Sequence, residues 1–307
     1  MTAPGKRRLR HDPSPIPDAV VPPGPSTIDL HAHSTRSDGV LDPATLVRAV
    51  AAAGVRTFSL TDHDTLAGCR ELVASGALPD GLELIPGVEI NAVVQDRADL
   101  WESELHVLGF GMDPADEAFE ATLAGQRARR RERFDRTVDR LRALGRPIDA
   151  QVERLDLGTD DALGRPTIAR ALIAAGYATT VEDAFARLIG RGRPAYVPRI
   201  GLGPVEAIRA IRAAGGVAVL AHFREAVTQR ELLRDLIAEG LEGLEVHYRA
   251  FDRPATEALA TVARELGLIA TGGTDYHGDT GTYTDAHSGL WVPPEVGARL
   301  VARLARG

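Results

Sequence analysis

Short apolar runs alternate with amphipathic stretches through most of this chain, and this alternation constrains its fold more than any other feature. Runs with strand character cover residues 27–30, 55–60, 82–85, 105–108, 217–220, 243–246 and 268–270, and amphipathic stretches cover 43–53, 204–214, 228–239 and 253–266. Strands that alternate with helices are typical of a parallel sheet wound with helices. The number of runs favours a closed or nearly closed barrel, so we predict an α/β fold of that kind.

One long segment breaks the alternation. Residues 113–198 contain only helical stretches, at 115–144, 150–155, 167–175 and 181–188, and glycines punctuate their ends. We therefore predict four parts: a disordered, proline-rich N-terminal tail at 1–25, a first barrel part at 26–112, a helical insertion or cap at 113–198, and a second barrel part at 199–307.

Composition limits the environment and the partners of the protein. The 307 residues carry a net charge of −7, so nothing global favours a polyanion, and an anionic substrate must be captured locally. Cys69 is the only cysteine, which suits a reducing compartment. No apolar region follows the basic N-terminus and no run is long enough to span a bilayer. We predict a cytoplasmic protein without a membrane association or an obligate protein partner.

Histidines and carboxylates stand at the carboxyl ends of nearly all the predicted strands, and one histidine stands within a strand. In (β/α) barrels the active site is built at that face. Seven of the nine histidines fall at such positions, and chance would scatter them over helices and loops. The residues concerned are His31, His33, Asp38, His63, Glu89, His106, His222, His247, Asp275 and His277.

Imidazole and carboxylate ligands without thiolate suit Mn²⁺, Fe²⁺ or Zn²⁺ in an open, hydrated site. His31 and His33 are two residues apart on an extended strand, so both side chains lie on one face. A carboxylate such as Glu89 can bridge two ions, and ions about 3.5–4 Å apart can clamp the two oxygens of a phosphoryl displacement. A bridging hydroxide would then be the nucleophile. A single histidine at a strand end is usually structural, but the whole set favours a multinuclear metal cluster.

These motifs resemble those of the PHP (polymerase and histidinol phosphatase) family. The matching stretches are Asp29-Leu30-His31-Ala32-His33-Ser34 with Ser37-Asp38-Gly39, Thr61-Asp62-His63-Asp64, Pro86-Gly87-Val88-Glu89, Ala221-His222 and Asp275-Tyr276-His277-Gly278. The resemblance implies a distorted seven-stranded, TIM-like barrel and three metal ions, with Mn²⁺ as the first choice. One ion would be held by His31, His33, Glu89 and Asp275, a second by Asp38, His63 and His277, and a third by Glu89, His106 and His222.

The branch that the chain resembles most includes 3′,5′-nucleoside bisphosphate phosphatases and a 5′→3′ exoribonuclease. The leading hypothesis is therefore a phosphatase that removes a phosphate monoester from a small nucleotide carrying two phosphates. The alternatives are a 5′→3′ exoribonuclease on short RNA, a histidinol phosphatase, and a catalytically dead module that only binds metal or a partner. Intact ligand motifs argue against the last.

Candidate substrate contacts come from the insertion. Arg127, Arg130, Arg131 and Phe134 recur at helical spacing on one face, and guanidinium groups suit a second phosphate remote from the metals. A solvated helix face with ion pairs explains the same run equally well. Arg165 is a second candidate.

Five other positions have open roles. Asp62 and Asp64 either orient ligands or cap helices, and His247 either reaches the substrate or is structural. Thr167 and Phe223 depart from the residues that the family often has, histidine and proline, which leaves the exact substrate open.

Overall fold

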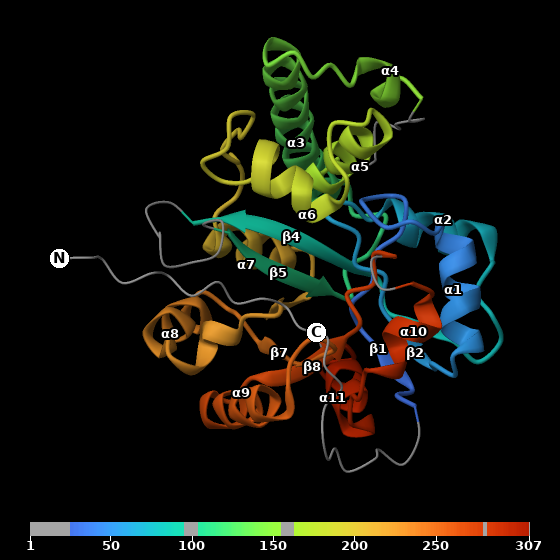
Figure 1. The fold of residues 1–307 in the computed structure, drawn as a ribbon. Coiled ribbons are helices and arrows are strands. Elements are labelled where there is room, and N and C mark those ends of the chain that lie inside the picture. Colours follow the sequence, from blue (N-terminus) through green and yellow to red (C-terminus); the bar gives the residue numbers. More distant parts are fainter. Residues whose placement is uncertain (1–24, 95–103, 155–162, 279–280, 307) are drawn as a thin grey trace.

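The computed structural model describes residues 25–94, 104–154, 163–278 and 281–306 (Figure 1). Its strands form two sheets with helices packed around them. The predicted α/β class is confirmed. The predicted disordered tail at 1–25 falls, except for Pro25, outside the described residues.

The first sheet contains three short parallel strands in sequence order, β1 (Ile28–Asp29), β2 (Thr57–Phe58) and β3 (Glu83–Leu84). Helix α1 (Pro43–Ala52) connects β1 to β2, and α2 (Ala67–Ser75) connects β2 to β3. The start of α1 is fixed by Asp42, whose carboxylate accepts a hydrogen bond from the amide of Thr45 at 2.8 Å. Both helices bury their apolar faces in the main hydrophobic core, to which the strand residue Phe58 also belongs.

The second sheet has five strands, in the order β4 (Gly87–Val93), β5 (Glu104–Phe110), β6 (Val217–Leu220), β7 (Gly243–Tyr248) and β8 (Ile269–Gly273). β4, β5 and β6 are antiparallel neighbours, and β6, β7 and β8 are parallel. The parallel part is wound with α8 (Arg230–Ala238) and α9 (Arg253–Leu266), and α7 (Pro204–Ala213) precedes β6. The 3₁₀ helix η3 (Arg224–Val227) follows β6.

The expected closed barrel is seen only in part, because hydrogen bonding leaves the strands in two sheets. Individual backbone hydrogen bonds nevertheless link the two sheets, at β1 with β8 and beyond β2 with β4. The amide of Leu30, just beyond β1, donates to the carbonyl of Gly272 in β8 at 3.0 Å, and the amide of Asp64 donates to the carbonyl of Glu89 in β4 at 2.9 Å. The carboxyl ends of the first sheet are thereby held against the second sheet.

Strand β4 is absent from the sequence prediction, which ended its strand at residue 85 and placed Glu89 beyond the carboxyl end of that strand. In the structure Glu89 and Asn91 lie within a strand whose first six residues are all buried. Two polar residues at alternating positions in a buried strand conceal its strand character, since a strand buried on both faces usually has an apolar sequence.

The segment between β5 and α7 is helical where it is described, as predicted. It contains α3 (Glu117–Ala143), α4 (Asp149–Val152), α5 (Arg165–Ala174), α6 (Val181–Ala184) and the π-helix η2 (Phe185–Ile189). Figure 1 shows these helices gathered on one side of β4. They share a separate hydrophobic cluster that runs from Phe134 to Ala195. The predicted domain boundaries and the role of this segment as a cap stay predictions.

The chain ends in α10 (Tyr283–Ser288) and α11 (Pro294–Leu304), and α11 packs against β8. Among the described residues, no helix combines the length and the apolar character that crossing a bilayer requires.

Candidate metal centre and adjoining arginine pocket

The nine predicted metal ligands converge at the carboxyl ends of β1, β2, β6 and β8 and on the inner faces of β4 and β5. Their ligand atoms form three groups, within each of which all atoms lie within 4.8 Å of one another. These groups are His31, His33, Glu89 and Asp275; His33, Asp38, His63 and His277; and Glu89, His106 and His222. The structure therefore brings together all nine residues in the three sets that the resemblance implied, with His33 also beside the second set.

Glu89 lies at the centre of the cluster and faces two groups at once. Its Oε2 atom lies 3.2 Å from His33 Nε2 and 2.9 Å from His63 Nδ1. Its Oε1 atom lies 2.7 Å from His106 Nδ1 and 3.3 Å from His222 Nε2. A carboxylate whose two oxygens face different groups of imidazoles has the geometry of a bridging ligand.

Several buried ligand atoms in the cluster lack a hydrogen-bond partner among the described residues. Buried polar atoms are normally satisfied, so a group of such atoms pointing at one another requires an explanation. His31 Nε2 and His33 Nε2 lie 3.2 and 3.1 Å from Asp275 Oδ1. Ligands about 2.1 Å from an ion are separated by roughly 3.0–3.4 Å in octahedral or tetrahedral geometry, so these residues fit a divalent ion. The buried ligand atoms without a hydrogen-bond partner are His31 Nε2, His33 Nε2, Asp38 Oδ1, His63 Nδ1, Glu89 Oε2 and Asp275 Oδ1.

The carboxylates and histidines strongly stabilise one another's charged forms. Burial alone would raise the pKa of Glu89, but His63, His106 and His31 together hold it well below its usual range. Burial alone would lower the pKa of His277, but Asp38 and Asp275 raise it to about 10. Because metal binding requires deprotonated ligands, a divalent ion would replace protons on the same lone pairs.

Unusual backbone conformations position some of these ligands. Among the described residues, the non-glycine residues with positive φ are Asp64 (50°), His222 (30°) and Asp275 (48°), and all three lie at the cluster or beside it. Such conformations are typical of functional sites, where surrounding contacts hold them. Gly273 instead allows β8 to approach His31 closely, since a Cβ atom at this position would come within 2.4 Å of the His31 Cβ atom.

Asp62 and Asp64 belong to none of the three groups but contact residues beside them. The carboxylate of Asp62 accepts hydrogen bonds from Ser34 N, Ser34 Oγ and Ser37 Oγ, each at 2.7 Å, and so fixes the loop that carries His33 and Asp38. The carboxylate of Asp64 forms a buried ion pair with the Nε atom of Arg130. Neither residue caps a helix, so the ligand-orienting interpretation agrees with the geometry.

The predicted substrate arginines on α3 are largely buried, and their face differs from the predicted one. Arg127 donates to the carbonyl of Asp64 at 3.2 Å and pairs with Glu120. Arg130 donates to the carboxylate of Asp64 and to Oδ1 of Asn91. Phe134 is buried with them as predicted, but Arg133 is buried while Arg131 is only half-buried, because α3 packs on the side of Arg133 against the segment that carries Gly164 and Arg199.

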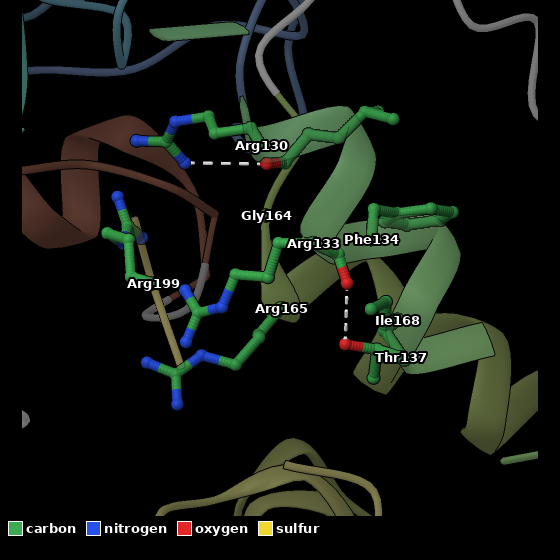
Figure 2. Close-up of a pocket in the computed structure, with 9 residues that line it drawn as sticks. Arg130, Arg133, Phe134, Thr137, Gly164, Arg165, Ile168 and Arg199 are labelled. Atoms are coloured by element: carbon green, nitrogen blue, oxygen red, sulfur yellow. Dashed lines mark hydrogen bonds between the residues drawn. The ribbon is translucent and has the colours of Figure 1, made fainter. Parts of the chain in front are cut away.

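Arg130 and Arg133 line a small pocket between α3 and the start of α5. Figure 2 shows the guanidinium groups of Arg133, Arg165 and Arg199 turned to the same side of it. Its other lining residues include Gly164, whose added Cβ would lie 3.4 Å from Asp38 Oδ2. The pocket therefore adjoins the metal cluster.

Four guanidinium groups, those of Arg130, Arg133, Arg165 and Arg199, crowd together around this pocket. Burial lowers the pKa of Arg133 to about 9, and the charges of Arg199 and Arg165 lower it as well. Two acidic residues stand beside them: Glu104, 3.1 Å from Arg199 Nε and 3.9 Å from Arg133 Nη1, and Asp64, which pairs with Arg130. Crowded guanidinium groups that keep their charge are stabilised by a bound anion.

His247 behaves differently from the other strand-end histidines. A β-bulge separates it from Glu245 in β7, and bulges re-aim the side chains that follow them. The acidic neighbour of His247 is Glu295 of α11, and burial lowers the pKa of His247 to about 4. Within the described residues no contact links the His247 side chain to the cluster, and its substrate role stays a prediction.

Sequence reasoning missed two residues of β7 that do reach the cluster. The Oε1 atom of Glu245 lies 3.0 Å from His31 Nδ1, and the hydroxyl of Tyr248 donates to Asp275 Oδ2 at 3.1 Å. Glu245 precedes His247 by two residues, but the bulge between them breaks the regular alternation, so this spacing is no guide to the face of Glu245. The bulge that separates Tyr248 from the regular alternation gives no sequence signal. Of the two departures from the family pattern, Phe223 lies in the main core and Thr167 in the first turn of α5.

Comparison with known proteins agrees with this geometry. The PHP domain model matches residues 29–149. The 5′-3′ exoribonuclease Rnm of Salmonella typhimurium is 35% identical over 87% of this chain and 90% of its own. The 3′,5′-nucleoside bisphosphate phosphatase of Chromobacterium violaceum is 31% identical over 82% of this chain and 87% of its own.

A solved structure supports the same assignment. It is described as a metal-dependent phosphoesterase from Bifidobacterium adolescentis, is 34% identical, and covers 90% of this chain and 95% of its own with a TM-score of 0.75. The chain therefore belongs to the PHP domain family of metal-dependent phosphoesterases, and it is a phosphoric ester hydrolase.

Proposed function

We propose that this protein removes the 3′-phosphate from a nucleoside 3′,5′-bisphosphate, with the 5′-phosphate anchored in the arginine pocket. The observation that carries the proposal is that the candidate metal cluster adjoins a pocket lined by four arginines. A bisphosphate needs both features, because one phosphate is cleaved while the other is only bound.

The metal centre is proposed to hold three divalent ions, in the three groups described above, with Mn²⁺ as the first choice and Fe²⁺ or Zn²⁺ as alternatives. When bound, the ions would polarise the phosphoryl oxygens and lower the pKa of water. The chain itself orients the ligands through Asp62 and Asp64 and encloses them among buried side chains. The lack of sulfur ligands and the unpartnered imidazole and carboxylate atoms support this assignment.

The proposed architecture around this centre is a distorted barrel built from the eight described strands of the two sheets, one more than the seven expected, with the helical segment as a cap. The linking hydrogen bonds Leu30 N–Gly272 O and Asp64 N–Glu89 O support the barrel. The separate hydrophobic cluster of the helical segment supports the cap.

In the arginine pocket, Arg130, Arg133, Arg165 and Arg199 are proposed to bind the phosphate that is not cleaved. Arg127 would act less directly, since its guanidinium already engages Glu120 and the carbonyl of Asp64. Arginine binds phosphate through paired hydrogen bonds. Histidinol phosphate carries a cationic amine, and these arginines argue against it as the substrate.

A second candidate function is 5′→3′ exoribonuclease activity on short RNA. The relatives named 5′-3′ exoribonuclease, at 34–35% identity, are more similar to this chain than the bisphosphate phosphatase is. Both reactions would break a P–O3′ bond one nucleoside away from an anchored 5′-phosphate. A water oxygen adds to phosphorus and a proton goes to the departing O3′. The reactions differ only in whether the cleaved phosphate carries a further nucleotide.

Phosphate and nucleotide release from a substrate panel with added Mn²⁺ tests the proposal. The panel contains 3′-phosphoadenosine 5′-phosphate, AMP, histidinol phosphate and short 5′-phosphorylated RNA. The proposal expects the highest kcat/KM on the bisphosphate, with AMP and inorganic phosphate as products. A higher kcat/KM on RNA, with 5′-mononucleotides as products, would establish the second candidate instead. Activity on histidinol phosphate alone would overturn both.

A further inference from the structure

We propose that Glu245 is a positioning residue that sets the tautomer of the His31 imidazole and holds the backbone of His222, so that a single carboxylate organises two of the three candidate metal groups. This inference rests on the proposed metal centre, in which His31 belongs to the first group and His222 to the third. Glu245 itself belongs to none of the three groups.

The two carboxylate oxygens of Glu245 contact two different candidate ligand residues. The residue lies in β7 and is fully buried. Its Oε1 atom lies 3.0 Å from Nδ1 of His31, and its Oε2 atom accepts a hydrogen bond from the backbone amide of His222 at 2.7 Å. The carboxylate therefore ties β7 to His31, which lies just beyond β1, and to His222, which lies just beyond β6.

The contact with His31 decides which ring nitrogen carries the proton. An ionised carboxylate only accepts hydrogen bonds, so Nδ1 of His31 must be the donor. The lone pair of a neutral ring is then on Nε2, which lies 3.4 Å from Glu89 Oε2 and 3.2 Å from Asp275 Oδ1. A partner on the far nitrogen is the usual way in which proteins orient a metal-ligating histidine.

The contact with His222 holds a strained backbone. The φ angle of His222 is +30°, a conformation that is costly for a residue other than glycine and persists only where surrounding contacts hold it. The amides of the other two such residues, Asp64 and Asp275, donate to backbone carbonyls, those of Glu89 and His31. His222 instead depends on a side chain, so a substitution can remove its support.

Replacing this carboxylate by an amide separates the two tasks without changing the shape of the side chain. A glutamine has one acceptor oxygen and one donor nitrogen. If its oxygen keeps the His222 amide, its NH₂ group faces His31 Nδ1 and favours a proton on Nε2, which removes the lone pair from the cluster. If its oxygen faces His31, its NH₂ group opposes the His222 amide. The first orientation therefore disturbs the metal group that contains His31, and the second disturbs the group that contains His222.

Two measurements test the inference, and the first needs no variant. In the metal-free wild-type protein, at a pH high enough for the His31 ring to be neutral, ¹⁵N NMR of the histidine rings should show its single proton on Nδ1. A neutral His31 protonated only on Nε2 would overturn the proposal, whether or not any substitution folds. This result does not depend on metal binding, so it remains decisive even if the proposed metal centre fails.

The second measurement compares Glu245→Gln with a matched control, Glu242→Gln. Glu242 stands just before the same strand, and its carboxylate pairs with Arg303 of α11 instead of a ligand. We expect Glu245→Gln to weaken binding of Mn²⁺ by about 10–100-fold and to lower the number of ions per chain in elemental analysis, while Glu242→Gln matches the wild type. Equal metal affinity and content in both variants would refute the role of Glu245. A wild-type protein that binds no metal would instead refute the proposed function.

Discussion

The Oε2 atom of Glu89 lies 2.9 Å from the Nδ1 atom of His63, where the end of the first sheet meets the second. The two residues also form an isolated parallel bridge between their backbones. The candidate metal cluster is therefore built across the junction of the two sheets. Residues far apart in the sequence must be held there together, and Glu89, with an oxygen toward each of two groups, is the residue that they share.

Replacing Glu89 with glutamine should abolish most of the activity while leaving the fold intact. The change keeps the shape of the side chain but removes the charge that two ions would share. We expect kcat to fall by on the order of 10²-fold or more, by analogy with the loss of one group that stabilises a transition state. Steady-state kinetics with the bisphosphate measures the change. Glu83→Gln, at an exposed position in β3, is the control and should keep normal turnover. Near-normal turnover of Glu89→Gln would exclude it as a ligand.

Removing metal should lower the thermal stability of the protein. Ions that bind only the folded state add about 2.7 kcal/mol at one hundred times their Kd, which corresponds to roughly 4 °C in a chain of this size. A strong chelator should therefore lower Tm by at least several degrees, and Mn²⁺ should restore it. Differential scanning calorimetry gives the answer, and an unchanged Tm would contradict a metal centre.

Cys69 should remain unreactive after metal removal, because the core is independent of the ions. Its thiol donates to the carbonyl of Leu60 at 3.3 Å, and burial raises its pKa to about 12. The thiol is therefore protonated at about pH 8, and a raised pKa leaves little of the reactive thiolate. We expect no reaction with Ellman's reagent in the native or the chelated protein, and one reacting thiol per chain in denaturant. Rapid reaction after chelation would show that the ions hold the core together.

Arg165→Ala should impair a bisphosphate substrate selectively. Loss of one charge-assisted contact to phosphate costs about 1.5–3 kcal/mol, so KM for 3′-phosphoadenosine 5′-phosphate should rise by roughly 10–150-fold. An aryl phosphate lacks the second phosphate, and its kcat/KM should change little. Arg187→Ala is the control, since Arg187 is exposed and pairs with Asp183 in the same helical segment. An equal fall for both substrates would mean that Arg165 supports the fold or the metals.

Arg130→Ala should reduce both substrate affinity and stability. Its guanidinium lines the pocket and pairs with the buried carboxylate of Asp64. Breaking a buried pair on one side costs about 3–5 kcal/mol, because a charge is left without its partner. Urea unfolding should show this loss, and the double variant Asp64→Asn with Arg130→Ala should recover part of it. If Arg130→Ala is as stable as the wild type, the ion pair between Arg130 and Asp64 does not stabilise the fold.

The sequence alone determined the α/β class, the helical segment and the identity of the residues that gather at the cluster. Strand–helix alternation is a local pattern, and the position of a histidine at a strand end is a local property as well. Parallel strands bring their carboxyl ends to one face. The strand-end positions of His31, His63 and His222 are therefore sufficient to predict that these residues lie near one another.

Tertiary structure decided which residues support those ligands and where an anion could bind. The bulge in β7 turns Glu245 and Tyr248 to the cluster and leaves His247 beside Glu295, and nothing local in the sequence marks the bulge. The packing of α3 against the segment from Gly164 to Arg199 decides that Arg133 is buried and Arg131 is not. Contacts of this kind depend on how elements distant in the chain pack together, and periodicity within one element carries no information about its partners.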